Sequence, residues 1–286
     1  MFKRVMVAVV GIPFLLLVLC WAPEWATMVL MCGMCAIGAW ELMHAVAGER
    51  GKALIPLTVL AAALVPVGVY VELSAQYEED LTALPQLPVT AVVGVCFVVL
   101  VFALAIHRYD AQQGIPFAAV TAALFAGLVF PLMLSCLLRL RLVPFLGELL
   151  VFFPLCIAFG SDTFALFAGM LCGKHKLAPR VSPKKTVEGA VGGLIGGVIG
   201  MTIMMFVGGW VLQDAFIGPR EVLLFGIVGS AVSQIGDLSF SVIKREFGVK
   251  DYGNLLPGHG GILDRFDSVT FVAPVVWLAL RLLWAL

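Results

Sequence analysis

The residues best suited to chemistry lie in one stretch near the C-terminal end, residues 241–267. This stretch reads SVIKREFGVKDYGNLLPGHGGILDRFD and places lysines, arginines, aspartates and a histidine close together in a chain that is 62% hydrophobic. A charge beside lipid costs about 2.5–3.5 kcal/mol at a helix centre, so a cluster of charges in such a chain indicates a functional site. Basic side chains, carboxylates and a Gly-Gly turn together suit phosphate groups that are held with a divalent metal ion.

Asp237 and Asp264 are the expected metal ligands. Asp237 lies near the end of one apolar segment and Asp264 at the start of the next, so two helix ends that meet at one membrane face could bring both carboxylates to one ion. Mg²⁺ usually takes one or two carboxylates and completes its shell with water and phosphate oxygens. Asp267 follows Asp264 by three residues and shares its helical face, which makes it a further candidate ligand. Asp162, expected to be a buried acid within a span, could serve the metal, the nucleotide or a structural hydrogen bond.

The segment Ser182–Thr186, with the sequence SPKKT, is a candidate anion site. Ser182 before Pro183 is typical of a helix N-cap followed by a first-turn proline. Free backbone N–H groups and the helix dipole would then lie beside Lys184 and Lys185, where they could receive a phosphate. The alternative interpretation is that these lysines only satisfy the preference for positive charge on the cytoplasmic side.

Ser241 and Lys244 are three residues apart, so they share a helical face and could hold a triphosphate beside the metal. The alternative interpretation is that these two residues lie on a solvated helix surface. The glycines after His259 permit close backbone approach to a ligand, and we expect His259 to bind rather than transfer a proton, because a phosphate monoester is already ionised. Asp237, Asp264 and Lys244 are the expected catalytic residues. The expected substrate-binding residues are Ser182, Lys184, Lys185, Thr186, Ser241, Arg245, Lys250, His259, Gly260, Gly261 and Arg265.

These motifs resemble the signature of the phosphatidate cytidylyltransferases, also called CDP-diglyceride synthases. The resemblance covers roughly residues 155–270, and the first 150 residues resemble the family in hydropathy only. It implies a membrane enzyme that converts CTP and phosphatidate to CDP-diacylglycerol and pyrophosphate. It also implies that Asp237 and Asp264 bind Mg²⁺, with a second, monovalent cation as a further candidate. The residues that carry it are Ser161-Asp162-Thr163, Gly173–Pro179, Ser182–Gly189, Gln234–Asp237, Ser241, Lys244-Arg245, Lys250-Asp251, Gly253, Leu256-Pro257, His259–Gly261, Asp264-Arg265 and Asp267.

Two alternatives remain open at the level of sequence. One is a CTP-dependent cytidylyltransferase for a different lipid, because the signature motifs do not indicate which acyl chains the lipid substrate carries. The other is a lipid or ion transporter with an ion site within the membrane. Transporters usually carry polar, interrupted helices in both halves of an inverted repeat, whereas the polar residues of this chain concentrate in one half.

The elements that position these residues are membrane helices. The mean hydropathy is +1.07 and only 13% of the residues are charged, against about 25% in soluble domains. The sequence therefore predicts an all-α, polytopic membrane protein whose cytoplasmic loops form the active site. We treat residues 1–286 as a single membrane domain with a scaffold half, 1–150, and a catalytic half, 151–286. About nine spans are expected, near residues 4–22, 25–44, 53–73, 89–106, 116–138, 149–172, 187–212, 222–241 and 267–285.

The distribution of basic residues predicts the orientation of these spans. With the N-terminus in the cytoplasm, fourteen of the 18 lysines and arginines fall on the cytoplasmic side, together with the expected active site. Such a protein would lie in the inner, cytoplasmic membrane of a cell. The net charge of zero gives no general attraction to nucleic acid, so the expected partners are CTP, phosphatidate and membrane lipids.

Glycines repeat every four residues along the span at 187–212 and define two helical faces. Small residues at this spacing let helices approach closely in lipid. We expect internal helix packing here, with a homodimer interface as the alternative.

Overall fold

The computed structural model describes residues 2–77, 88–111, 114–214, 216–255 and 260–284. Within these ranges, eight helical segments are long and apolar enough to cross a membrane, and each lies within a few residues of an expected span. The expected first span corresponds to helix α1 (Phe2–Cys20), whose apolar part, Val9–Cys20, is shorter. The all-α, polytopic fold is confirmed. The eight segments are Glu24–Val46, Gly48–Gln76, Val89–Tyr109, Phe117–Arg141, Gly147–Cys172, Val187–Leu212, Pro219–Glu246 and Leu263–Leu283.

The chain divides into two compact units. The first contains Met1–Leu142 and Val249–Arg265, and the second contains Val143–Gly248 and Phe266–Leu286. The charged stretch of residues 241–267 is therefore divided between the units, and helix α13 (Leu263–Trp284) begins in the first and continues in the second. The organisation as one membrane domain with two halves stays a prediction.

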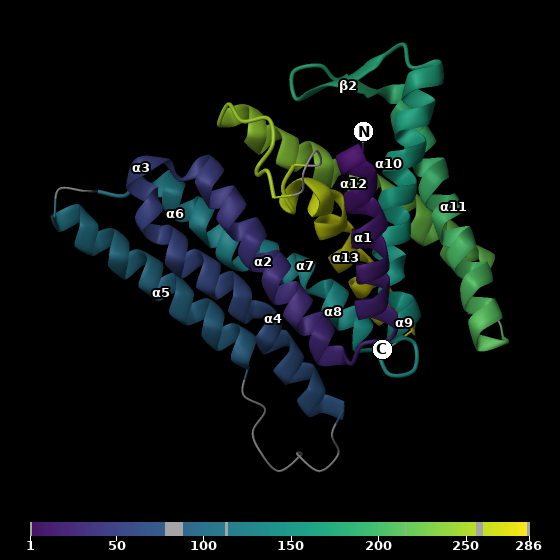
Figure 1. The fold of residues 1–286 in the computed structure, drawn as a ribbon, viewed down its shortest axis with the longest axis horizontal. Coiled ribbons are helices and arrows are strands. Elements are labelled where there is room, and N and C mark those ends of the chain that lie inside the picture. The colour runs from purple at the N-terminus through teal and green to yellow at the C-terminus, as the bar shows by residue number, and fades with distance from the viewer. Residues whose placement is uncertain (1, 78–87, 112–113, 215, 256–259, 285–286) are drawn as a thin grey trace. The chain divides into compact units, whose positions relative to one another are not determined.

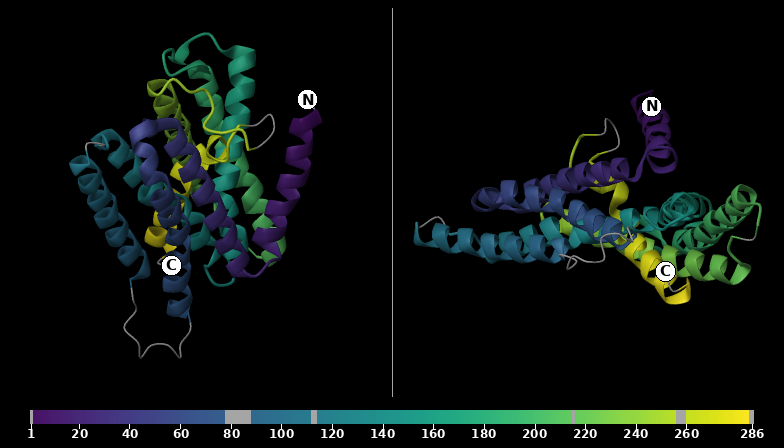
Figure 2. Two further views of the ribbon diagram at one scale, coloured as in Figure 1. Left: turned by 60° about the vertical axis from the view of Figure 1, so that its left-hand side comes forward. Right: turned by 90° about the horizontal axis from the view of Figure 1, so that it is seen from below.

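The first unit is built around α2 (Glu24–Val46), α4 (Ile55–Tyr77) and α5 (Val89–Asp110), which lie side by side (Figures 1 and 2). Apolar side chains such as Met31, Val65 and Phe97 are buried in this unit. Lipid offers no hydrogen-bond partners, so apolar segments of this length satisfy their backbone as helices. The shorter elements are α3 (Gly48–Gly51), η1 (Lys52–Leu54), α6 (Phe117–Leu124), η3 (Phe125–Val129), α7 (Phe130–Leu134) and α8 (Cys136–Arg141).

The span at Phe117–Arg141 contains one π-helical turn, η3, which ends at Val129, two residues before Pro131. Proline lacks the backbone N–H that would bond to the carbonyl four residues earlier, and its ring crowds that carbonyl. A widened turn relieves this conflict while the helix continues. The proline therefore accounts for the irregularity of this span.

In the second unit, α10, α11 and α12 pack closely through glycines. A short hairpin connects the C-terminal end of α10 to the start of α11 (Figure 1). On one face of α11, Gly196 approaches Gly160 of α10 so closely that a Cβ on either would collide with the partner's carbonyl oxygen. On its other face, Gly197 meets Ser230 of α12 in the same way. Both glycine faces are thus used inside this unit, as small residues allow in lipid. The elements are α9 (Gly147–Leu150), α10 (Phe152–Cys172), β1 (Lys176–Ala178), β2 (Ser182–Thr186), α11 (Val187–Leu212), α12 (Pro219–Glu246) and most of α13.

Candidate active site

Asp237 and the lysine-bearing segment Ser182–Thr186 come together in the second unit. Lys185 Nζ forms an ion pair with Asp237 Oδ2, and each of the two side chains is 26% exposed. Ser241, one turn further along α12, donates to Asp237 Oδ1 at 3.3 Å. The two basic-acidic patches that the sequence separates by some fifty residues therefore form one polar cluster.

The segment Ser182–Thr186 is a strand, so the prediction that Ser182 caps the helix is wrong. Strand β2 pairs antiparallel with β1, with Lys176 opposite Thr186 and Ala178 opposite Ser182. The residues paired in this hairpin are extended, and a helix can begin only after the last of them. Thr186 is the N-cap, with extended backbone angles, and its Oγ1 accepts the N–H of Gly189 at 3.1 Å. Lys184 and Lys185 therefore project from a strand rather than from a helix N-terminus.

Two side chains, Glu188 and Arg245, bond to this hairpin and to the residues directly before it. Glu188, in the first turn of α11, accepts the N–H groups of Lys174 at 3.1 Å and His175 at 3.2 Å, and its Oε1 lies 2.6 Å from His175 Nδ1. Arg245 Nε donates to the carbonyl of Val181 at 3.0 Å. Arg245, predicted to bind substrate, thus also ties the hairpin to the end of α12.

A cavity of about 580 Å³ lies between this hairpin and helices α10, α11 and α12. Its polar lining contains both cations and carboxylates, and Gln234 is held there by a 3.0 Å hydrogen bond to the carbonyl of Ala190. Lys176 also lines the cavity, beside the predicted residues. The cavity is lined by Asp162, Ala165, Leu166, Gly169, Met170, Lys176, Leu177, Lys184, Lys185, Thr186, Gly189, Ala190, Gln234 and Asp237.

Three aspartates from three helices gather near this cavity. Asp267 on α13 is buried, with 8% exposure, and accepts the N–H of Ser268 at 2.7 Å. Ser268 Oγ lies 3.5 Å from Asp162 Oδ2, and Asp267 is also within electrostatic range of Asp237 and Lys244. Asp162 is exposed, so the expectation that it is buried is wrong. Its place on the cavity side of α10 explains this exposure.

The second group of predicted residues belongs to the first unit and comes from the loop before α13 and from the first turn of that helix. Asp264 Oδ2 accepts the N–H groups of Tyr252 at 2.9 Å and Gly261 at 3.0 Å. Gly260 has a φ of +85°, which agrees with the expected tight turn and favours glycine. His259 lies outside the described residues. Lys250 and Arg265 are exposed.

Asp237 and Asp264 belong to different units, so their convergence on one metal ion stays a prediction. Among the described residues, no three His, Cys, Asp or Glu side chains are grouped closely enough to form a ready-made metal site. Mg²⁺ does not require such a group, because waters and substrate phosphates complete its shell. The carboxylates of Asp237 and Asp267 in the second unit fit such a site.

Sequence reasoning missed one functional candidate, Glu41 on α2. This carboxylate is 1% exposed and accepts the N–H groups of Ile262 at 3.1 Å and Leu263 at 2.9 Å. An ionisable residue inside an apolar span is a functional hypothesis by default, and Glu41 interrupts the apolar span at 25–44. A lone acid in an apolar span could therefore have identified Glu41 as a candidate, but the sequence does not reveal which backbone groups it contacts.

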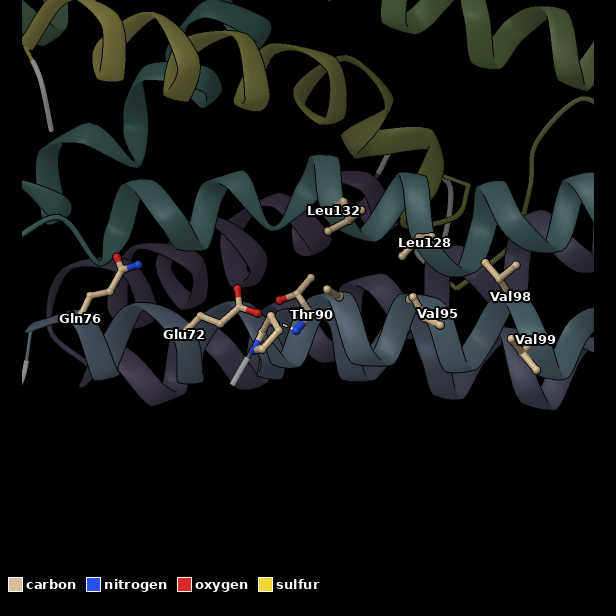
Figure 3. A pocket seen from close by; sticks show the side chains of 11 residues that line it. Glu72, Gln76, Thr90, Val95, Val98, Val99, Leu128 and Leu132 are labelled. Atoms are coloured by element: carbon tan, nitrogen blue, oxygen red, sulfur yellow. Dashed lines mark hydrogen bonds between the residues drawn. The ribbon is translucent and has the colours of Figure 1, made fainter. Parts of the chain in front are cut away.

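A second cavity, of about 730 Å³, lies in the first unit between α4, α5 and the span at Phe117–Arg141 (Figure 3). Its lining is mainly apolar, and its polar side chains are Glu72, Gln76 and Thr90. None of the predicted site residues lines it. The chemistry therefore concentrates at the cavity of the second unit and at the loop before α13.

The sequence as a whole matches the model of the cytidylyltransferase family over residues 2–283. The chain belongs to this family. The match includes the first 150 residues, which contain none of the motifs described above and resemble the family by sequence inspection in hydropathy only. The described part of the chain contains eight helices long and apolar enough to cross a membrane, and this family member is a multi-pass membrane protein.

Curated relatives carry the name phosphatidate cytidylyltransferase. The protein from Rickettsia bellii is 32% identical over 182 residues, which cover 63% of this chain and 78% of the relative. The Bacillus subtilis protein is 35% identical over 161 residues, or 56% of each chain. The Staphylococcus saprophyticus protein is 48% identical over 126 residues, which cover 44% of this chain and 46% of the relative. The matched stretch thus spans about half the length of the last two relatives.

Proposed function

We propose that this chain transfers a cytidylyl group from CTP to phosphatidate and so forms CDP-diacylglycerol and pyrophosphate. The observation that carries the proposal is the cavity of the second unit, which lies among membrane helices and combines Lys184 and Lys185 with Asp237. Cations beside carboxylates suit phosphates held with a metal ion. Family membership and the names of the relatives support the same reaction.

In this reaction, an oxygen of the phosphatidate phosphate forms a bond to the α-phosphorus of CTP. The bond from that phosphorus to the oxygen that bridges to the β-phosphate breaks, and this oxygen leaves with pyrophosphate. The attacking oxygen is already ionised near neutral pH, so no general base is needed. The task of the protein is therefore to hold two anions together in line and to offset their charge.

The basic residues of the second unit supply that charge. Lys184 and Lys185 line the cavity, and Lys244 lies about two helical turns beyond Asp237 on α12. Ammonium groups in a partly buried site bind phosphate oxygens strongly. We assign Lys244 and Arg245 mainly to the CTP phosphates and the segment Ser182–Thr186 mainly to the phosphatidate headgroup.

Mg²⁺ is the cofactor that fits the carboxylates of this site. Asp237 and Asp267 would hold it, with Asp264 as the further ligand that the family resemblance implies. Asp267 is buried and lies within electrostatic range of Asp237 and Asp162, and a buried carboxylate beside like charges favours a cation nearby. When bound, the ion offsets the charge that develops on the phosphates and on the leaving pyrophosphate.

The decisive experiment measures pyrophosphate release by the purified full-length protein in lipid nanodiscs. We expect release only when CTP, phosphatidate and Mg²⁺ are all present, with CDP-diacylglycerol as the lipid product. Diacylglycerol in place of phosphatidate is the control, because it lacks the attacking phosphate. A lipid that moves between leaflets on addition of CTP without pyrophosphate release would instead support a transporter.

We further propose that the N-terminus and the active site face the cytoplasm of a bacterial cell. The basis is the bias of lysine and arginine toward one side of the threaded spans. Reporter tags after Arg180 and after Leu286 should then report opposite sides of the membrane. Tags that report the same side would contradict this threading.

A further inference from the structure

Glu41 on α2 forms a long-range polar contact with the described part of the loop before α13. Its Oε1 accepts the N–H of Ile262 and its Oε2 that of Leu263, across more than two hundred residues of sequence. The first N–H groups of a helix have no partner within the helix. A carboxylate at this position satisfies two of them and also interacts favourably with the helix dipole. Glu41 thus acts as a cap of α13 that is supplied by another helix.

The loop is shaped to accommodate this carboxylate. A Cβ on Gly261 or on Gly253 would collide with the carboxylate oxygens of Glu41. Two glycines, eight residues apart in the signature loop (described residues 249–255 and 260–262), therefore approach the same side chain. A larger residue at either position would require the Glu41 carboxylate or the loop to shift.

A second carboxylate holds the same loop. Asp264 Oδ2 accepts the N–H groups of Tyr252 and Gly261. The backbone of Gly261 thus lies between the two acids, with its N–H on Asp264 and its Cα against Glu41. The carboxylates of Glu41 and Asp264 thus accept the N–H groups of residues 252 and 261–263.

We propose that Glu41 is a positioning residue for the cytidylyl-transfer reaction. It acts through the backbone of Gly261, Ile262 and Leu263, which it fixes relative to α2, and so sets the placement of the signature loop and of Asp264. The inference rests on the proposed function, because the loop belongs to the predicted substrate- and metal-binding residues. A catalytic site requires placement within about half an ångström, so loss of this contact should reduce turnover more than it reduces folding.

The same unit offers a matched control in Glu72 on α4. Glu72 Oε1 accepts the N–H of Thr90 at 2.7 Å, next to the start of α5, and Figure 3 shows this bond as a dashed line. Both acids therefore accept backbone N–H groups at the N-terminal end of a helix. Only Glu41 contacts the signature loop.

The experiment compares Glu41→Gln with Glu72→Gln in the full-length protein in nanodiscs. The readouts are Tm, kcat, the apparent KM for each substrate and hydrogen–deuterium exchange of the backbone amides. We expect Glu41→Gln to lower kcat about 10- to 100-fold, the equivalent of about 1.4 kcal/mol per tenfold, and to speed exchange at residues 261–263. Glu72→Gln should shift Tm to a similar extent while kcat changes less than about twofold.

Two further variants separate position from charge. Gly261→Ala keeps the carboxylate and displaces the loop, so it should lower kcat as Glu41→Gln does. The double variant should then lose much less than the product of the two single effects, because both changes act on one contact. Glu41→Asp keeps the charge and should recover part of the lost turnover.

The inference is overturned if Glu41→Gln keeps its kcat, or if Glu41→Gln and Glu72→Gln lose activity in the same proportion as they lose folded protein. If the wild-type protein releases no pyrophosphate, the proposed function fails. Exchange at residues 261–263 then decides by itself whether Glu41 holds the loop.

Discussion

Asp237 and Asp264 are both predicted metal ligands near helix ends, but their surroundings differ in kind. The partners of Asp237 are side chains, the ammonium group of Lys185 and the hydroxyl of Ser241. Asp264, in the first turn of α13, accepts the backbone N–H groups of Tyr252 and Gly261 in the preceding loop. Side chains can rotate to exchange one partner for a ligand, whereas backbone groups move only with the loop. Asp237 should therefore respond to ligands directly, and Asp264 should respond through the geometry of its loop.

The strongest test of this comparison is Asp237→Asn. This change removes the charge that binds Lys185 and that we assign to Mg²⁺, so we expect at least a 10²- to 10³-fold loss of cytidylyl transfer with membrane insertion retained. Pyrophosphate release across a Mg²⁺ titration measures it. The matched control is Ser241→Ala, which removes the other partner of Asp237 and should have a smaller effect. Turnover near the wild-type level at saturating Mg²⁺ would remove Asp237 from the site.

Asp264→Asn should also abolish most turnover, but with a second signature. Asparagine accepts the N–H groups of Tyr252 and Gly261 more weakly, so exchange at these two amides should increase. Asp237→Asn should leave their exchange unchanged. If the two variants lose activity and the loop amides exchange as in the wild type, the distinction between the two aspartates fails.

The lysines test whether the two anionic substrates use separate patches. Lys244→Ala should raise the apparent KM for CTP more than that for phosphatidate, and Lys184→Ala should do the reverse. A charged hydrogen bond contributes about 1.5–3 kcal/mol, so each affected KM should rise roughly 10- to 150-fold. Lys185→Ala should affect both substrates, because Lys185 joins the hairpin to Asp237. Equal effects on both substrates from Lys184→Ala and Lys244→Ala would indicate one shared anion site.

The smallest effect is expected from Glu188→Gln. Glu188 holds the hairpin through Lys174 and His175, but its side-chain contact with His175 is solvent-exposed, and exposed ion pairs contribute little. We expect the apparent KM for phosphatidate to rise about two- to threefold, with kcat unchanged. Steady-state kinetics with phosphatidate varied at saturating CTP measures this change. A loss as large as that of Lys184→Ala would show that the hairpin depends on this contact.

Sequence alone was sufficient for the membrane helices, and it selected candidate site residues whose roles stay predictions. The predicted span at 187–212 coincides with α11, because an apolar run of this length can satisfy its backbone in lipid only as a helix. Asp237, Lys184 and Lys185 were selected because charged residues are rare in such a chain, and the structure places them around one cavity. These conclusions depend on local composition and spacing, which a sequence contains in full.

Only the tertiary structure decided which groups contact one another. Ser182 precedes a proline as a helix cap would, yet pairing with β1 makes it part of a strand and moves the cap to Thr186. Glu41 lies in the half of the chain without recognisable motifs, yet it binds the backbone at Ile262 and Leu263. Strand pairing and the partner of a buried acid are interactions between distant segments. No local pattern encodes them, because their free energy depends on how the chain brings those segments together.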